Sequence, residues 1–326
     1  MIVVSGMAGA LVGPLPWPIA TLPGFVELAA VGCDWMPGLV EAALADAGHR
    51  ADDLAWRPVG VYRAGDGAEA CRLAQTWDWC GPALGIDAEC AGGLVALLLA
   101  AQDLEVGRCD IAVVAAENLA PGERQWDEGC APLAAAAREA RPRAGAAVLV
   151  LERWGEARRR RAQIAGGAHR RLGAPAGMVG LSLRGIAELL RDGLARASLS
   201  PADVGYVELH ALGSAVGDAV EIAAFRKVWE DCPGNRPTVL GSHKVRLGHL
   251  EATGGLVSLA RIVAWFDRSI LPPTPWVRPF SRLLAFSPAF VLEQGDNPEV
   301  RAGGSLALSR SGVGAMVLLK HCQGRF

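Results

Sequence analysis

The segment IDAECAGGLVALLLAAQDL, residues 86–104, places Cys90 before one alanine, a pair of glycines and a long apolar run. A cysteine in this place is either a small buried residue at the start of a core helix or a nucleophile at a helix N-terminus. The thiolate is the reactive form, and a helix N-terminus lowers the pKa of a thiol. Glu89 opposes that effect, because a neighbouring anion raises a thiol pKa unless it points away or is paired.

Two of the six histidines occupy positions comparable to that of Cys90. His210 ends an apolar run in VELHALGSAVGDAVE, and His249 precedes a predicted helix in GSHKVRLGHLEATGG. All three residues fall where a predicted strand leads into a helix, where α/β proteins often place functional groups. A thiolate and two imidazoles suit acyl transfer, because the imidazoles move protons or stabilise an oxyanion or enolate. The spacing alone leaves open a set of buried core residues instead.

Short apolar runs alternate with helical patterns along the chain, which predicts an α/β fold with buried, mainly parallel strands. Strands are predicted at 1–11, 58–65, 110–118, 144–152, 162–168, 205–211, 238–242, 305–311 and 314–320. Helices are predicted at 40–48, 92–107, 184–199, 219–229 and 251–266. We therefore expect two similar halves, 1–155 with the cysteine and 156–326 with both histidine motifs. Their similarity suggests an internal duplication, although no residue-level repeat is evident.

The composition excludes several classes of protein. Hydrophobic residues make up 51% and charged residues 20%, which indicates a globular chain. The net charge of −2 gives no sign of nucleic-acid binding, and the basic run at 158–161 is expected to be solvated. The eight cysteines form no CxxC pair, so we predict reduced thiols in a cytoplasmic protein and no metal site. An uncharged, proline-interrupted N-terminus argues against a signal peptide or a membrane span.

Several motifs in the right order show that the chain resembles the β-ketoacyl synthase family of condensing enzymes, which have the thiolase fold. DAECAGGLVALLLAA stands where the family has Asp-Thr-Ala-Cys-Ser-Ser and a Leu-Val-Ala-Leu helix. VELHALGSAVGDAVE is similar to Val-Glu-X-His-Gly-Thr-Gly-Thr followed by Gly-Asp and a Glu, and KVRLGHLEA is similar to Lys-X-X-X-Gly-His-Leu-Glu-Ala. Pro272, Pro273 and Thr274 match a further family motif. The resemblance runs from about residue 1 to 320.

This resemblance implies a layered αβαβα arrangement and a decarboxylative Claisen condensation in polyketide or fatty-acid-type biosynthesis. Cys90 would take an acyl group from an acyl carrier protein as a thioester. His210 and His249 would assist decarboxylation of a malonyl unit and stabilise the enolate, and Lys244 would hold charge near His249 or orient the site. No cofactor is implied, because the phosphopantetheine arm of the carrier protein holds the substrate. No metal is implied either.

Asp218 and Glu221 are supporting residues by the same resemblance, which makes them organisers of the site. The alternative is helix capping, since GDAVE places an acid in the first turn of a predicted helix. The implied partners are an acyl carrier protein and a second ketosynthase-like subunit, in a homodimer or a heterodimer. Neither a nucleic acid nor a membrane is expected as a partner.

The chain departs from the family pattern in four places. The regions before Cys90 and between residues 118 and 144 are short for the family, Glu89 replaces a small residue, and 211–214 read Ala-Leu-Gly-Ser instead of Gly-Thr-Gly-Thr. The C-terminal Gly-Phe-Gly-Gly-Thr-Asn-Ala-His signature is reduced to SRSGVGAMVLL, without its gating Phe and its Asn. Backbone amides near Ser311 and Gly312 remain as candidates for part of an oxyanion hole.

These departures leave two alternatives to a condensing enzyme. One is a non-elongating partner subunit like the chain-length factors, which the short loops and Glu89 favour and the retained Cys90 opposes. The other is a ketosynthase-like acyltransferase or decarboxylase that does not extend its substrate, which the loss of the gating Phe favours.

The sequence generates a first prediction about Glu89. If its carboxylate faces Cys90, Glu89→Ala lowers the pKa of the thiol and speeds its labelling by iodoacetamide near neutral pH. The measurement is the labelling rate at Cys90 by peptide mass spectrometry. Unchanged or slower labelling would mean that Glu89 faces elsewhere, for instance into a dimer contact.

Overall fold

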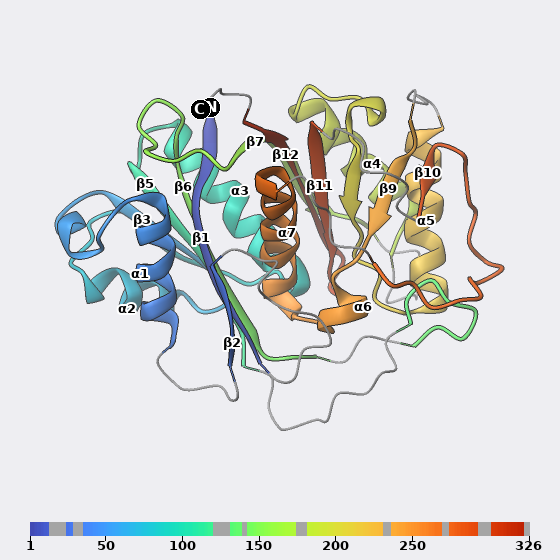
Figure 1. The fold of residues 1–326 in the computed structure, drawn as a ribbon, viewed down its shortest axis with the longest axis horizontal. Helices are drawn as coiled ribbons and strands as arrows, with labels where there is room; N and C mark the ends of the chain where they lie inside the picture. The colour runs from blue at the N-terminus through green and yellow to red at the C-terminus, as the bar shows by residue number, and fades with distance from the viewer. Residues whose placement is uncertain are drawn as a thin grey trace.

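The computed structural model describes residues 1–12, 24–28, 35–119, 131–138, 142–173, 181–230, 236–268, 274–292 and 301–322. These residues form a mixed β-sheet structure with helices packed against its faces (Figure 1). No helix in these ranges is long and apolar enough to cross a membrane.

The first half of the fold contains the predicted strands and helices, and three short elements that escaped prediction. Its elements are β1 (Ile2–Val12), β2 (Phe25–Leu28), α1 (Trp35–Ala47), β3 (Val59–Ala64), α2 (Gly67–Thr76), β4 (Ala83–Ile86), α3 (Gly92–Glu105), β5 (Ile111–Asn118) and β6 (Gly145–Arg153). β2, α2 and β4 were not predicted. α2 has only a narrow buried face, but Asp66 caps it by accepting a hydrogen bond from the Ala68 amide at 2.9 Å. A cap of this kind is the signal that would have located this helix.

The second half has a similar succession of elements. They are β7 (Ala162–Arg171), α4 (Leu183–Arg196), β8 (Tyr206–Glu208), α5 (Ala215–Trp229), β9 (Thr238–Gly241), α6 (Lys244–Leu247), α7 (Gly254–Arg268), β10 (Phe290–Val291), β11 (Ala302–Leu308) and β12 (Val313–His321). The succession differs in having no counterpart of β2 among the described residues and two further short elements, α6 and β10. The strand predicted at 205–211 is shorter, because the amides of His210 and Ala211 donate to the Glu221 carboxylate rather than to a neighbouring strand.

Strand order reveals the internal duplication directly. The first half is ordered β4-β3-β5-β6-β1 and the second β9-β8-β11-β12-β7, so corresponding strands occupy corresponding places. In both halves the first two neighbouring pairs are parallel and the last two are antiparallel. A short antiparallel pairing of residues 2–4 of β1 with 162–164 of β7 joins the halves. The division at residue 155 itself stays a prediction.

Three hydrophobic clusters define the layers of the fold. One packs α1 and α2 on the outer face of the first half, and another packs α4 and α5 on the outer face of the second. The third lies between the two halves and is built around α3 and α7. Adjacent residues of β5 show the alternation, since Val113 belongs to the outer cluster and Val114 to the central one. The layered αβαβα arrangement is confirmed, with α3 and α7 in the centre (Figure 1).

A local repeat marks the two central helices. Residues 89–97 are ECAGGLVAL and residues 251–259 are EATGGLVSL, which are identical at six of nine positions. Both segments begin with a 3₁₀ turn, Glu89–Ala91 or Glu251–Thr253, that leads into α3 or α7. The two glutamates have nearly the same left-handed φ, 47° and 48°. A residue-level trace of duplication therefore does exist, and it lies at the N-termini of α3 and α7, where the two halves meet.

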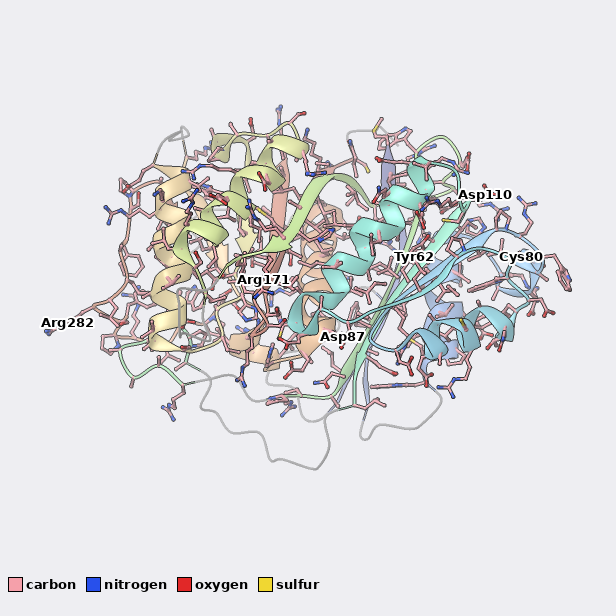
Figure 2. The ribbon with its side chains drawn as sticks, turned by 180° about the vertical axis from the view of Figure 1, so that it is seen from behind. Tyr62, Cys80, Asp87, Asp110, Arg171 and Arg282 are labelled. Atoms are coloured by element: carbon pink, nitrogen blue, oxygen red, sulfur yellow. The ribbon has the colours of Figure 1, made fainter. Side chains whose placement is uncertain are left out.

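The paired glycines of this repeat allow the two helix N-termini to pack closely. A Cβ on Gly93 would lie 2.5 Å from the Ala252 carbonyl oxygen, and one on Gly255 would lie 2.6 Å from Leu94 Cγ. Neither position has room for a side chain, so both copies of the repeat keep the residue type that this contact requires. Seen from the opposite side, α3 crosses the middle of the molecule, with Asp87 near its beginning (Figure 2).

We predict that Gly93→Ala destabilises the protein by about 1–3 kcal/mol, because the added methyl group meets backbone and forces α3 away from the segment before α7. The measurement is the urea midpoint of unfolding. Gly38→Ala is the matched control, since Gly38 also lies in a helix but a Cβ there meets nothing within 4 Å. Equal midpoints for the two variants would contradict close packing at Gly93.

Candidate functional site

The structure brings the three sequence-predicted reactive side chains together at one cavity. Cys90 lies in the 3₁₀ turn between β4 and α3, His210 follows β8, and His249 lies between α6 and α7. The cavity, of about 200 Å³ including space open to solvent, is lined by these three side chains and by His243, Lys244, Glu251, Gly254, Gly255, Ser258, Leu306 and Ala307. The first half thus supplies the thiol and the second half supplies the imidazoles.

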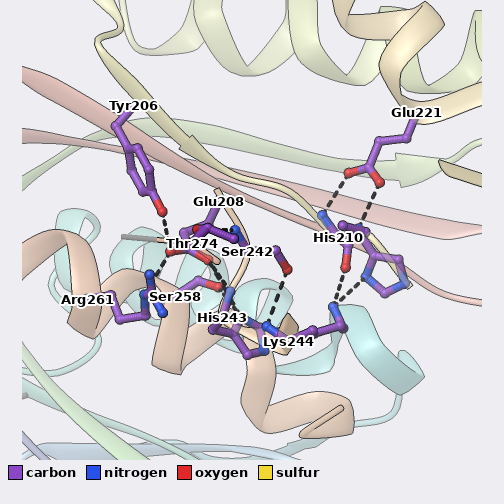
Figure 3. A network of polar contacts seen from close by, with 11 residues as sticks. Tyr206, Glu208, His210, Glu221, Ser242, His243, Lys244, Ser258, Arg261 and Thr274 are labelled. Atoms are coloured by element: carbon purple, nitrogen blue, oxygen red, sulfur yellow. Dashed lines mark hydrogen bonds and ion pairs between the residues drawn. The ribbon is translucent and has the colours of Figure 1, made fainter. Parts of the chain in front are cut away.

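The distances in this cluster suit proton transfer. Cys90 Sγ lies 3.2 Å from His249 Nε2, within hydrogen-bonding reach for sulfur. The rings of His210 and His249 lie edge to face, with centroids 5.9 Å apart. Lys244 donates a hydrogen bond to the His210 carbonyl oxygen, and its Nζ lies 3.4 Å from His210 Nδ1 (Figure 3). A thiol, a proton acceptor and a fixed cation therefore share one nearly buried space.

Glu221 and Asp218 hold the segment that carries His210. Glu221 accepts hydrogen bonds from the amides of His210 and Ala211 at 2.7 and 2.8 Å (Figure 3). Asp218 accepts from the amides of Leu133 and Gly213 at 2.9 and 3.2 Å. Both carboxylates therefore tie loop backbone to α5.

The cap of α5 is a different residue. Ser214 Oγ accepts a hydrogen bond from the Gly217 amide at 3.3 Å. This contact satisfies an amide at the helix N-terminus, as an N-cap does.

A buried polar network beneath Lys244 was not found by sequence reasoning. Glu208 is fully buried, and its carboxylate lies 2.8 Å from Arg261 Nε and accepts hydrogen bonds from Tyr206 OH and the His243 amide (Figure 3). Burial alone would raise the pKa of Glu208. The charge of Arg261 and the hydrogen bond from His243 outweigh burial and lower this pKa to about 2. Glu208 therefore stays ionised and holds the start of the segment from His243 to His249.

His243 is a third histidine at the cavity. Its Nδ1 lies 3.0 Å from Ser258 Oγ, and its buried Nε2 has no hydrogen-bond partner among the described residues. Burial lowers the pKa of His243 to about 4, so the ring is neutral near pH 7. The sequence could have indicated His243 as a site residue, because it directly precedes Lys244, the first residue of the motif KVRLGHLEA.

Left-handed backbone occurs beside each of the three reactive residues. Glu89, Ala211 and Glu251 have φ values of 47°, 38° and 48°, although none of them is glycine. Such conformations are rare for residues with a side chain and cluster at functional sites. Here they produce the sharp turns that direct the neighbouring side chains into the cavity.

Electrostatics at Cys90 contradict the expectation of a helix-activated thiolate. Burial and the Glu251 carboxylate raise the pKa of the Cys90 thiol to about 12, and the cation of Lys244 opposes this only in part. Burial and Lys244 lower the pKa of His249 to about 2 and move that of His210 in the same direction. The resting site near pH 7 is a neutral thiol beside neutral imidazoles, because desolvation outweighs the helix dipole.

Glu89 points away from the thiol and towards the C-terminal hairpin. Its Oε2 accepts a hydrogen bond from the Ser311 amide at 3.0 Å, and it is the weakest of the causes that raise the Cys90 pKa. The amide of Gly312, at φ 84°, donates to the Ser309 carbonyl at 3.2 Å. Both amides that were candidates for an oxyanion hole therefore already have acceptors within the chain.

Glu251 is the carboxylate that faces the Cys90 thiol. Its Oε2 lies 3.4 Å from Cys90 Sγ and 3.5 Å from His249 Nε2, and 38% of its side chain is exposed. The motif KVRLGHLEA contains this residue, but sequence reasoning assigned it no role. The repeat of residues 89–97 at 251–259 could have located Glu251, since it has the same place in the repeat as Glu89. Cys90, His249 and Glu251 are also the side chains here whose donor atoms lie close enough to share a metal ion.

Part of a further family motif lies at the edge of this site. Thr274 Oγ1 accepts a hydrogen bond from the Ser242 amide at 3.2 Å and so supports the segment before Lys244 (Figure 3). Pro272 and Pro273 lie outside the described residues.

We predict that Glu251→Gln accelerates iodoacetamide labelling of Cys90 more than Glu89→Gln does, because Glu251 contributes more to the raised pKa of the thiol. Each unit by which that pKa falls raises the rate near neutral pH about threefold, after allowing for the lower nucleophilicity of a less basic thiolate. Site-resolved peptide mass spectrometry in buffer with EDTA separates Cys90 from the exposed Cys71 and Cys80. The reverse order of the two variants would contradict this assignment.

Comparisons with known proteins agree with the fold. The family described as "Beta-ketoacyl synthase, N-terminal domain" matches residues 44–148, and its C-terminal domain matches residues 161–277. The spectinabilin polyketide synthase system protein NorC of Streptomyces orinoci is 31% identical over 91% of this chain. The highly reducing polyketide synthase 19 of Pyricularia oryzae is 31% identical over 75% of it. The chain spans only 14% and 10% of the length of these relatives.

Solved structures show the same fold. The oxazolomycin ketosynthase domain OzmH KS7 of Streptomyces albus JA3453 superposes with a TM-score of 0.86 at 21% identity, over 99% of this chain and 75% of that one. The KS8 domain of the same protein gives a TM-score of 0.84 at 25% identity, over 99% and 95%. With both family domains matched in order around Cys90, His210 and His249, the chain belongs to the β-ketoacyl synthase family and has its thiolase-like fold.

Proposed function

We propose that this protein is a ketosynthase that accepts an acyl group on Cys90 and condenses it with a malonyl unit by decarboxylative Claisen chemistry. The observation that carries the proposal is the 3.2 Å contact between Cys90 Sγ and His249 Nε2, in a cavity that His210 and Lys244 also line. A partner subunit that catalyses no reaction does not need a thiol, two imidazoles and a lysine at one cavity.

The first step is transfer of the acyl group from the phosphopantetheine thiol of an acyl carrier protein. Cys90 Sγ attacks the thioester carbonyl while its proton passes to His249 Nε2. His249 can accept this proton because its imidazole is neutral. The tetrahedral intermediate collapses, and the carrier thiol leaves with a proton. A buried thiol with a raised pKa needs this acceptor in contact, because little free thiolate exists near pH 7.

In the second step a malonyl thioester enters and loses CO₂, which leaves an enolate on the remaining acetyl thioester. His210 and His249 face one another at the cavity, and in their Nε2–H tautomers they are placed to donate hydrogen bonds to the enolate oxygen once Cys90 is acylated. The enolate carbon attacks the acyl-Cys90 carbonyl, a carbon–carbon bond forms, and the Cys90 thiolate leaves and takes up a proton from solvent. Lys244 holds the His210 segment in place through its bond to the His210 carbonyl.

Glu89 favours a second candidate function, acyl transfer or decarboxylation without extension. Its carboxylate accepts the hydrogen bond of the Ser311 amide and lies in the same turn as Cys90. An anion in this place opposes the approach of a malonyl carboxylate and leaves one backbone donor fewer for an oxyanion. The missing Phe of the C-terminal signature also suits an acceptor other than malonyl.

A mass measurement tests both candidates. The purified chain is incubated with acyl N-acetylcysteamine thioesters, which mimic the carrier arm, and with an acylated carrier protein. We expect one acyl adduct on Cys90, none in Cys90→Ala, and formation slowed about 10²–10⁴-fold in His249→Ala, which lacks the proton acceptor. Cys71→Ala is the matched control and keeps the adduct, because it removes an exposed thiol of α2 that does not line the cavity.

Addition of a malonyl thioester then separates the candidates. Release of CO₂ with a product two carbons longer supports condensation, whereas a stable adduct without extension supports the second candidate. Absence of any adduct would contradict both and leave a pocket-shaping partner subunit, whose association with a longer ketosynthase is measured by size-exclusion chromatography. The carrier protein and the dimer partner are part of this proposal.

A further inference from the structure

We propose that Cys90, His249 and Glu251 form a reversible zinc-binding site, and that bound zinc blocks the nucleophile. Binding of the ion is independent of the proposed function, whereas the block of acylation rests on it. The three residues come from both halves of the chain, so no spacing within the sequence predicted this set.

The donor atoms have the separations of three corners of a zinc tetrahedron. Cys90 Sγ, His249 Nε2 and Glu251 Oε2 lie 3.2, 3.4 and 3.5 Å apart in pairs. Tetrahedral bonds of the usual lengths to sulfur, nitrogen and oxygen place such ligands about 3.3–3.7 Å apart. The three separations therefore suit a zinc ion with shifts of a few tenths of an ångström.

The donor types select zinc over the hard cations. A thiolate and an imidazole nitrogen with a single carboxylate are typical zinc ligands, whereas magnesium and calcium require mostly oxygen. Coordination releases the thiol proton to solvent, so the three ligands carry two negative charges against the two positive charges of the ion. The fourth position faces the cavity and takes water, as in zinc sites with three protein ligands.

The ion has a route to the site along Glu251. Cys90 and His249 are 9% and 5% exposed, but 38% of the Glu251 side chain is open to solvent. Its carboxylate is therefore the first ligand that an incoming ion meets. The other two donors lie directly behind it.

The surroundings make the site exchangeable rather than structural. His249 Nδ1 is buried without a hydrogen-bond partner among the described residues, so nothing there fixes the ring as a ligand. Loss of such support lowers zinc affinity about 10–100-fold in other proteins. The nearby cation of Lys244 opposes the ion as well. We therefore expect zinc that a chelator removes while the fold remains intact.

The first experiment measures binding without any enzymatic readout. The full chain is stripped with EDTA, dialysed, and titrated with Zn²⁺ against a chromophoric chelator, and with Co²⁺ to detect a thiolate-to-cobalt charge-transfer band. We expect one ion per chain at this site, loss of the band in Cys90→Ser, and zinc binding weakened by more than about 100-fold in Glu251→Gln, because a lost direct ligand costs more than a lost supporting group. Glu89→Gln is the matched control, because Glu89 has the same place in the repeat but binds the Ser311 amide, and its zinc affinity stays unchanged.

Circular dichroism checks that each variant is folded. A cobalt band or zinc affinity that persists in Cys90→Ser would assign the ion to other cysteines and overturn the proposal, as would equal losses in Glu251→Gln and Glu89→Gln. If zinc binds as expected but acylation is never observed, the proposed function fails and the metal site stands. If acylation proceeds at the same rate with zinc bound, the block of the nucleophile is refuted.

Discussion

The close packing of the N-termini of α3 and α7 is the contact on which the site depends. Glycines at both helix starts let the turn that carries Cys90 reach the turn that follows His249, with Gly93 against the Ala252 backbone. Side chains at these places would separate the two turns, and the 3.2 Å contact between thiol and imidazole would be lost. The fold holds this contact in its central layer, where each half contributes one wall.

Burial in that layer determines the protonation of the reactive groups. Desolvation disfavours both the thiolate of Cys90 and the imidazolium forms of His210 and His249, so the pKa shifts leave all three groups neutral at rest. A fully buried charge is retained where its partner is fixed, as in the ion pair of Glu208 with Arg261 near the site. In the proposed function, Cys90 therefore relies on a proton acceptor in contact rather than on a low thiol pKa.

The duplicated turns have diverged in their partners. Glu89 and Glu251 share a backbone conformation and a place in the repeat, yet one binds the Ser311 amide and the other faces Cys90 and His249. The residue that follows each glutamate also differs, since it is Cys90 in one half and Ala252 in the other. The same ancestral turn thus supplies a reactive thiol once and a carboxylate beside that thiol once.

The sequence by itself determined the α/β class, most strands and helices, and the set of Cys90, His210, His249 and Lys244, because hydrophobic periodicity and ordered motifs are local properties. It identified Glu89 as the anion of interest from adjacency alone. Only the tertiary structure decided that a residue 161 positions after Cys90 faces the thiol, while its direct neighbour turns away. The reason is physical: the packing of the two halves brings Glu251 to the Cys90 thiol and the Ser311 amide to Glu89, and neither contact follows from distance along the chain.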